Sequence, residues 1–183
     1  MTASATDNDI HWFAMRDLTR RNAKMPGYKL LTECRFEVFT PMMRRLTTRH
    51  GRRVSEEVPF MQDLLFVRAS REELNPVVAK TPTLQYRYVH GGFCEPMIVP
   101  DGDMQRFINA VKSCESPRYF RIDEITPDMY GRYVRIVGGS LDGYEGHLLA
   151  ARGSKFRRLI VELPNCMAAA IEVQPDLIEV IQR

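Results

Sequence analysis

The stretch GRYVRIVGGSLDGYEGHL, residues 131–148, decides the predicted fold of the C-terminal part of the chain. Val134, Ile136 and Leu148 fit a pleated, half-buried surface, with polar residues between them. Four glycines then interrupt the pattern. Because glycine tolerates positive φ and lets two backbones approach closely, this spacing predicts a tight turn between two strands of a small barrel.

Residues 127–183 contain only short runs with the character of strands. They are 133–137, 146–151, 158–163, 170–173 and 178–181. Five such strands in so short a segment predict a small closed barrel. The fourth strand is the weakest prediction, because the run 168–170 is alanine and alanine favours helix.

The preceding residues 11–113 mix strand and helix patterns. Strands are expected at 11–16, 36–40, 54–68 and 84–88, and helices at 26–33, 70–81 and 100–111. Ser70 and Glu73 have the spacing of a capping box, which marks the start of the second helix. We therefore expect an α+β chain. It comprises a disordered tail at 1–10, an antiparallel sheet flanked by helices at 11–113, a linker at 114–126 and a five-stranded, SH3-like barrel at 127–183.

Charge is divided unevenly along the chain. Residues 1–113 carry 17 Lys/Arg and 13 Asp/Glu, whereas residues 114–183 carry 9 and 10. Contact with nucleic acid is therefore expected in the N-terminal part. The ten residues 44–53 contain five arginines, one histidine and no acid. Together with the turn at His50 and Gly51, they predict a long basic hairpin that links two strands.

Several classes of function have no support in the sequence. The four cysteines and four histidines are scattered, so neither a zinc site nor any other metal site is expected, and no cofactor. No phosphate-cradling loop or nucleophile elbow is present, so we expect no enzyme. The chain has no apolar run of the ~20 residues that span a membrane and no cationic and apolar leader, which indicates a cytoplasmic protein.

Three patches resemble the NusG family of transcription elongation factors: residues 12–16, 61–67, and 134–146 with 158–162. The last patch is similar to the KOW motif, and the order of elements over 11–183 agrees with the family's N-terminal (NGN) domain and KOW barrel. There are departures. Gln62-Asp63 replaces a Pro-Gly pair, Pro26-Gly27 interrupts the first helix, and Asn165-Cys166-Met167 stands where many relatives have a Gly-Arg turn. These departures favour a specialised paralogue, similar to UpxY-like or RfaH-like antiterminators.

The resemblance implies that the N-terminal domain binds the clamp helices of RNA polymerase through exposed apolar side chains. The candidates by position are Trp12, Phe13, Phe39, Phe60, Met61 and Leu65. Most of these residues are equally suited to the domain's own core. For Phe60 and Met61 we expect exposure, because they follow Pro59 and lie outside the most apolar run.

The basic residues are candidates for contact with non-template or upstream DNA. They are Arg20, Arg21, Lys24, Arg44, Arg45, Arg49, His50, Arg52 and Arg53. Arginine suits phosphate because its guanidinium donates forked, charge-assisted hydrogen bonds. A charge run is as often a solvated tip, and both interpretations stay open here.

For the barrel the resemblance implies recruitment of a small-subunit ribosomal protein or a termination factor, by a monomeric factor with no membrane contact. Leu141 and Tyr144 lie on the glycine-rich turn, where they either contact the partner or close the end of the barrel. The alternative is a ribosome-associated KOW protein that binds RNA. It predicts a basic barrel, which the charge balance of residues 114–183 does not favour.

Overall fold

The computed structural model describes residues 8–150, 153 and 156–181. The disordered tail predicted at 1–10 lies mostly outside them. By their internal contacts the residues divide into two compact units, Met1–Asp101 and Gly102–Arg183. The division falls at the start of the third helix, whereas the sequence predicted a boundary one helix later, at residue 113.

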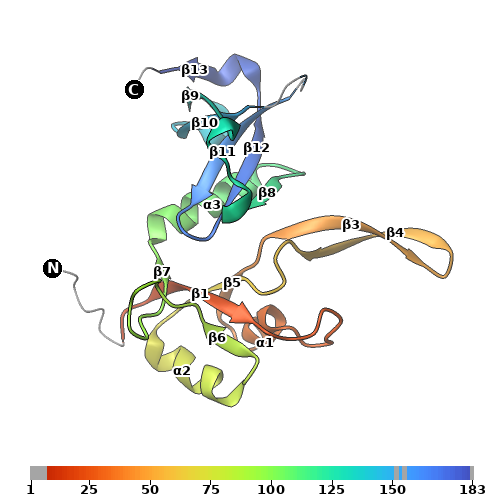
Figure 1. The fold of residues 1–183 in the computed structure, drawn as a ribbon, viewed down its shortest axis with the longest axis vertical. Coiled ribbons are helices and arrows are strands. Elements are labelled where there is room, and N and C mark those ends of the chain that lie inside the picture. The colour runs from red at the N-terminus through yellow and green to blue at the C-terminus, as the bar shows by residue number, and fades with distance from the viewer. Residues whose placement is uncertain (1–7, 151–152, 154–155, 182–183) are drawn as a thin grey trace. The chain divides into compact units, whose positions relative to one another are not determined.

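The first unit is an antiparallel sheet with helices on one face (Figure 1). Its strands follow the order β2-β5-β1-β6, and β7 also pairs with β1. The elements are β1 (His11–Asp17), α1 (Gly27–Glu33), β2 (Glu37–Phe39), β3 (Met42–Arg49), β4 (Arg52–Pro59), β5 (Leu65–Ala69), α2 (Arg71–Lys80), β6 (Leu84–Tyr86) and β7 (Ile98–Val99). The predicted antiparallel sheet is confirmed, and so are α1 and α2.

The core of this unit follows from strand alternation. Phe13 and Met15 on β1 pair with Val67 and Leu65 on β5, so these four side chains point to the same face. They form one buried cluster that includes Leu31 of α1 and Leu74 of α2. The capping box predicted at the start of α2 is confirmed, because the Glu73 N–H donates to Ser70 Oγ at 3.2 Å and the Ser70 N–H donates to Glu73 Oε2 at 3.3 Å.

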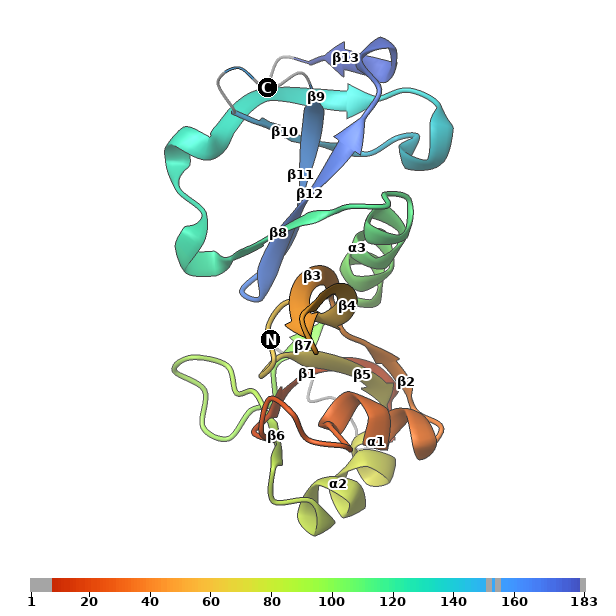
Figure 2. The same ribbon diagram turned by 90° about the vertical axis from the view of Figure 1, so that its right-hand side faces the viewer.

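The second unit contains a helix and a six-stranded antiparallel sheet in the order β13-β9-β10-β11-β12-β8 (Figure 2). Its elements are α3 (Asp101–Lys112), β8 (Arg118–Arg121), β9 (Tyr130–Ile136), β10 (Glu145–Leu149), β11 (Arg157–Leu163), β12 (Met167–Val173) and β13 (Ile178–Val180), with 3-10 turns at Ile122–Glu124, Pro127–Met129, Gly139–Leu141 and Pro175–Leu177. All five predicted strands are present.

The predicted linker at 114–126 contains a strand, which corrects the sequence prediction. Within it β8 pairs with β12, with Phe120 opposite Ala168. Tyr119 and Phe120 are buried, whereas the flanking Arg118 and Arg121 are exposed. Charge at both ends and the neighbouring Pro117 concealed this short apolar pair in the sequence.

The alanine run is also strand rather than helix. Ala168, Ala169 and Ala170 are fully buried in β12, between β11 and β8. Small side chains fit this enclosed position, and the pairing on both edges outweighs a helix preference of less than about 1 kcal/mol per residue.

Candidate functional site

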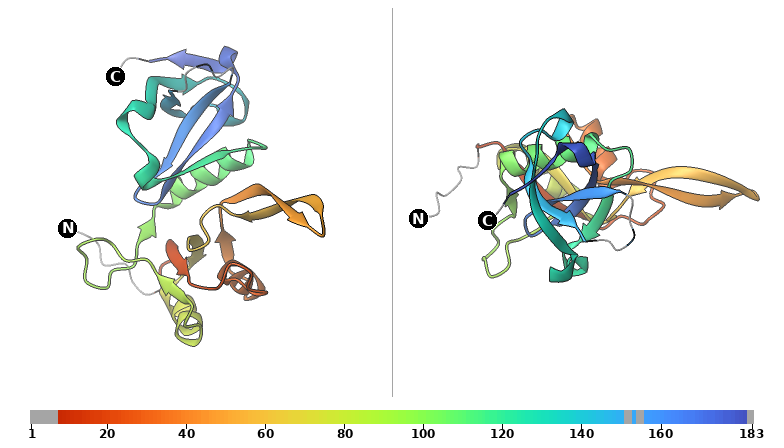
Figure 3. Two further views of the ribbon diagram at one scale, coloured as in Figure 1. Left: turned by 45° about the vertical axis from the view of Figure 1, so that its right-hand side comes forward. Right: turned by 90° about the horizontal axis from the view of Figure 1, so that it is seen from above.

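Strands β3 and β4 form a two-stranded ribbon, which confirms the predicted long hairpin (Figures 1 and 3). Their eight-residue register runs from Met42 opposite Pro59 to Arg49 opposite Arg52, a length of roughly 26 Å at the usual rise per residue. His50 and Gly51 form the turn with φ of 50° and 76°. Positive φ at both positions is the backbone of a two-residue hairpin turn that suits the twist of the strands.

All the ribbon's basic side chains that the sequence nominated are exposed. They are Arg44, Arg45, Arg49, His50, Arg52 and Arg53. The register shows what the sequence could not, because Arg44 stands opposite Glu57 and Arg45 opposite Glu56. By residue count the half near the sheet carries two arginines and two glutamates and the tip carries three arginines, of which Arg49 is paired with Glu56 at 2.7 Å.

The other nominated cations lie in the loop between β1 and α1. Arg20, Arg21 and Lys24 are exposed there. Asp17, only 3% exposed, holds the loop, because its carboxylate accepts hydrogen bonds from the Thr19 N–H at 2.9 Å and the Gly27 N–H at 2.6 Å. Figures 1 and 3 show the loop and the ribbon extending past the same side of the sheet.

The nominated apolar anchors are less accessible than the sequence predicted. Phe13 and Leu65 belong to the core cluster under α1 and α2, because strand alternation turns them towards the helices. Trp12 is 3% exposed and Met61 is 6% exposed. In this structure these four side chains therefore offer no surface to a partner.

The prediction that Met61 is exposed is wrong, and the cause is a turn. The sequence suggested one extended segment from 54 to 68, but β4 ends at Pro59 and β5 begins at Leu65. Between them the Phe60 N–H donates to the Pro41 carbonyl at 2.8 Å and the Leu64 N–H donates to the Met61 carbonyl at 3.3 Å. This turn buries Met61 and leaves Phe60 half-buried, as is Phe39 on β2.

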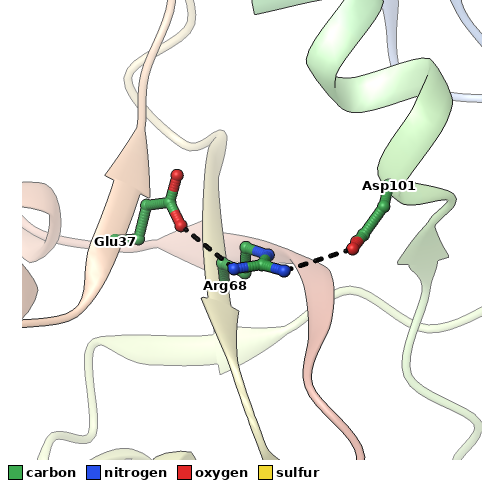
Figure 4. Close-up of polar contacts among 3 residues, drawn as sticks. All are labelled: Glu37, Arg68 and Asp101. Atoms are coloured by element: carbon green, nitrogen blue, oxygen red, sulfur yellow. Dashed lines mark hydrogen bonds and ion pairs between the residues drawn. The ribbon is translucent and has the colours of Figure 1, made fainter.

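The sheet face opposite the helices carries a polar bridge beside Trp12. Arg68 pairs with Trp12 across β1 and β5, and its guanidinium joins two carboxylates from other elements. Figure 4 shows it between Glu37 of β2, at 3.5 Å, and Asp101 at the start of α3, at 3.4 Å. These ion pairs join Glu37 on the edge strand and Asp101, the last residue of the first unit, to β5.

Leu141 and Tyr144, the residues predicted to contact a partner, are not exposed at the end of a loop. Leu141 is 4% exposed, so it closes the end of the core, which was the alternative interpretation. Tyr144 is half-buried against α3. Its hydroxyl donates to the Arg106 carbonyl at 2.9 Å, and the Arg106 guanidinium lies 4.9 Å from the centre of its ring. Burial raises the pKa of Tyr144.

Sequence reasoning missed an aromatic cluster on β9 and β10. The His147 ring lies 5.1 Å from the Tyr130 ring and 5.0 Å from the Tyr133 ring, centre to centre, edge to face in both cases. The three aromatic residues stand inside or directly before the stretch 131–148, so the sequence contained them. Only the register of β9 with β10 places Tyr133 opposite His147. The cluster lines a cavity of about 430 Å³.

Two glycines of the same stretch make this arrangement possible. A Cβ on Gly131 would meet the Leu148 carbonyl oxygen at 2.8 Å, and one on Gly146 would meet the Ile160 carbonyl oxygen at 2.9 Å. Both distances are shorter than any ordinary contact. Glycine is therefore required where the backbones of β9 and β10, and of β10 and β11, approach closely.

The family of the chain follows from a match to known proteins. The model of the family described as transcription termination factor NusG matches residues 10–108, more than half of the chain. The chain belongs to the NusG family. The NusG-family match covers the ribbon, the basic loop and all six nominated apolar anchors. The aromatic cluster and the nominated tips Leu141 and Tyr144 lie outside it.

Other comparisons are more distant. A solved structure concerned with domain interaction in Thermotoga maritima NusG is 14% identical to this NusG-family chain, with a TM-score of 0.49, and the match covers 95% of this chain and 98% of that one. No curated protein matches in sequence. No helix among the described residues is long and apolar enough to cross a membrane.

Proposed function

We propose that this chain is a non-enzymatic elongation and antitermination factor that acts in the cytoplasm as a monomer. Its first unit binds the clamp helices of RNA polymerase and its second unit recruits another protein. Membership of the NusG family, which rests on residues 10–108, is the observation that carries the proposal. The departures at Gln62-Asp63 and Asn165-Cys166-Met167 support a specialised, operon-specific member of UpxY or RfaH type.

The polymerase contact is best assigned to Phe39 and Phe60. Binding of a helix in a groove depends on a few aromatic or aliphatic anchors that are accessible before binding. Of the six nominated anchors these two are half-buried, whereas the other four are buried. Phe39 lies on β2 with its ring 6.3 Å from that of Phe66, so a rigid strand positions it.

The experiment is co-purification of the full chain with core RNA polymerase. Phe39→Ala combined with Phe60→Ala is expected to weaken retention by at least about tenfold, as for anchors at the centre of an interface. Phe93→Ala is the matched control, because Phe93 is 97% exposed in the loop between β6 and β7 and is not assigned to the contact. Unchanged retention of a folded double variant would exclude this surface.

The ribbon is proposed as the contact with the non-template strand or the upstream duplex. Excess positive charge at its tip suits phosphate, and single strands are bound by such charge together with stacking groups. The loop that carries Arg20, Arg21 and Lys24 extends past the same side of the sheet and would prolong this contact.

The second unit is proposed to be a KOW barrel that recruits a protein, either a small-subunit ribosomal protein or a termination factor. The order β13-β9-β10-β11-β12 supports a barrel, because the last of the five predicted strands lies beside the first. The unit Gly102–Arg183 carries 11 Lys/Arg and 11 Asp/Glu, a balance that favours a protein partner over RNA. Deletion of the gene should shorten the transcripts of a few long operons only, if the role is operon-specific.

A further inference from the structure

The cavity beside β9, β10 and β11 combines aromatic rings with carboxylates. Tyr130, Tyr133 and His147 supply the rings, and Glu145 and Glu162 are among the polar residues that line it. The Tyr130 hydroxyl donates to Glu162 Oε1 at 2.8 Å, which fixes the carboxylate beside the ring. A carboxylate has about four acceptor positions, so Glu162 can accept further hydrogen bonds.

One lining residue of the cavity is a glycine that no larger residue can replace without a shift of the backbone. This residue is Gly146, and a Cβ at its position would meet the Ile160 carbonyl oxygen at 2.9 Å. The volume of the cavity, about 430 Å³, lies within the range of small-ligand sites and exceeds the size of a guanidinium group.

An arginine of the chain already binds at the edge of this cavity. Arg106 of α3, one of the lining residues, places its guanidinium 4.9 Å from the centre of the Tyr144 ring. Its Nη2 donates to the Glu145 carbonyl oxygen at 2.5 Å. The rings of Tyr130, Tyr133 and His147 and the carboxylate of Glu162 line the same cavity, so it offers a second combination of ring and oxygen acceptor.

We propose that this cavity binds an arginine side chain from a basic segment of a partner protein. The proposal rests on the recruiting role assigned above to the second unit and names the chemistry of the partner. Three carboxylates, those of Asp103, Glu145 and Glu162, line the cavity with one cation, Arg106. Glu145 is paired with Arg135 at 2.6 Å, so an excess of one negative charge remains, and Glu162 is the carboxylate beside the rings. This charge attracts a guanidinium and repels phosphate. Arginine fits better than lysine, because its planar group stacks on a ring while its forked donors reach a carboxylate.

The test uses the full chain without polymerase, labelled for NMR, and the peptide acetyl-Gly-Ser-Arg-Gly-Arg-Ser-Gly-amide. The ring signals of Tyr133 and His147 are expected to shift on titration. The same peptide with citrulline in place of arginine, which keeps the shape but loses the charge, should leave them unchanged. Glu162→Gln should weaken binding by about tenfold, as expected for loss of a charge-assisted hydrogen bond.

Glu172→Gln is the matched control. Glu172 lies on β12 and is paired with Arg158 at 3.8 Å, outside the cavity, so the variant loses the same charge from the same unit and should bind the peptide normally. Tyr130→Phe, which keeps the ring but releases Glu162, provides a second variant and should also weaken binding. Both variants should retain polymerase, since that contact is assigned to the first unit.

Three results would overturn the proposal. One is equal binding of the arginine and citrulline peptides. Another is normal peptide binding by folded Glu162→Gln and Tyr130→Phe. The third is a shift of the same rings by oligouridylate but not by the peptide, which would assign the cavity to RNA. None of these results bears on polymerase retention, so failure here is distinct from failure of the clamp contact.

Discussion

Arg49 and Glu56 form an ion pair across the β3–β4 ribbon, with 2.7 Å between Arg49 Nη2 and Glu56 Oε1. The pair restrains one of the tip arginines and offsets its charge. Its side chains are 68% and 28% exposed, so it contributes at most about 1 kcal/mol to stability. The pair therefore matters more for the charge that the ribbon presents than for the fold of the ribbon.

Glu56→Gln is expected to strengthen binding to DNA. The ribbon, residues 42–59, contains five arginines and two glutamates, and the variant removes one of the two acids and releases Arg49. If Arg49 then meets a phosphate, the slope of log affinity against log salt steepens by about 0.7 to 0.9. Fluorescence anisotropy with a labelled single strand measures this. Glu33→Gln at the end of α1 is the control, and an equal change in both variants would contradict a role for the ribbon.

Arg52→Glu with Arg53→Glu should have the opposite effect. Adjacent strand residues point to opposite faces, so this pair reverses charge on both faces of the tip. Loss of two phosphate contacts should lower the salt slope by about 1.4 to 1.8. The matched control is Lys29→Glu with Lys80→Glu, which makes the same charge change on α1 and α2. Similar losses in the two double variants would indicate a general field effect rather than a contact.

Gly131→Ala and Gly146→Ala are each expected to destabilise the second unit by roughly 1–3 kcal/mol, because the added Cβ meets a backbone carbonyl that cannot move alone. Urea titration followed by the amide signals of β9 to β11 measures the change. Gly102→Ala is the control, since apart from its chain neighbours and the backbone of α3 itself nothing lies within 4 Å of its Cβ position. A loss no larger than that of the control would show that the two strand crossings can relax.

Elements of the fold that follow local sequence patterns could be predicted from the sequence, and elements that depend on pairing between distant segments could not. The five strands predicted within residues 127–183, the ribbon and the capping box at Ser70 follow local patterns, and all are present. The strand β8 and the burial of the alanines in β12 do not follow, because both depend on pairing between distant segments. Pairing outweighed the local preference of Ala168–Ala170 for helix.

The candidate site was predictable only in part, for a related reason. Charge is a property of sequence, so the basic side chains of the ribbon are exposed as expected. The exposure of an apolar residue cannot be predicted in the same way, because an apolar side chain suits either a core or an interface. Met61 is buried in the five-residue turn between β4 and β5, and Leu141 is buried in the turn Gly139–Leu141. The aromatic cluster required the register of β9 with β10.

Asp17→Ala is expected to loosen the loop that carries Arg20, Arg21 and Lys24. Asp17 is buried and accepts two backbone hydrogen bonds, so its removal leaves the Thr19 and Gly27 amides without this acceptor. A cost of roughly 1–3 kcal/mol follows for each buried group left unsatisfied. Hydrogen exchange of residues 18–27 should accelerate, whereas that of α2 changes less. Equal acceleration throughout the first unit would indicate global unfolding instead.

Tyr119 is expected to make the stability of the second unit sensitive to alkaline pH. The residue lies on β8 opposite Ala169, and burial, with a smaller effect from the charge of Cys114, raises the pKa of its phenol from 10.0 to about 12. Above pH 10 the unfolded chain gives up this proton while the folded unit keeps it until about pH 12. The unfolded state is therefore favoured progressively over this interval, and not below it.

Tyr119→Phe should remove this sensitivity while keeping the buried ring. Relative to the variant, the wild-type chain is expected to lose free energy of unfolding steadily from pH 10 to pH 11.5, measured by urea titration at each pH. Absorbance at 295 nm provides an independent measure, because the variant should lack a phenol that ionises near pH 12. Parallel stability curves for the two proteins over this interval would show that water reaches the Tyr119 hydroxyl, and that β8 does not stay paired with β12 in alkaline solution.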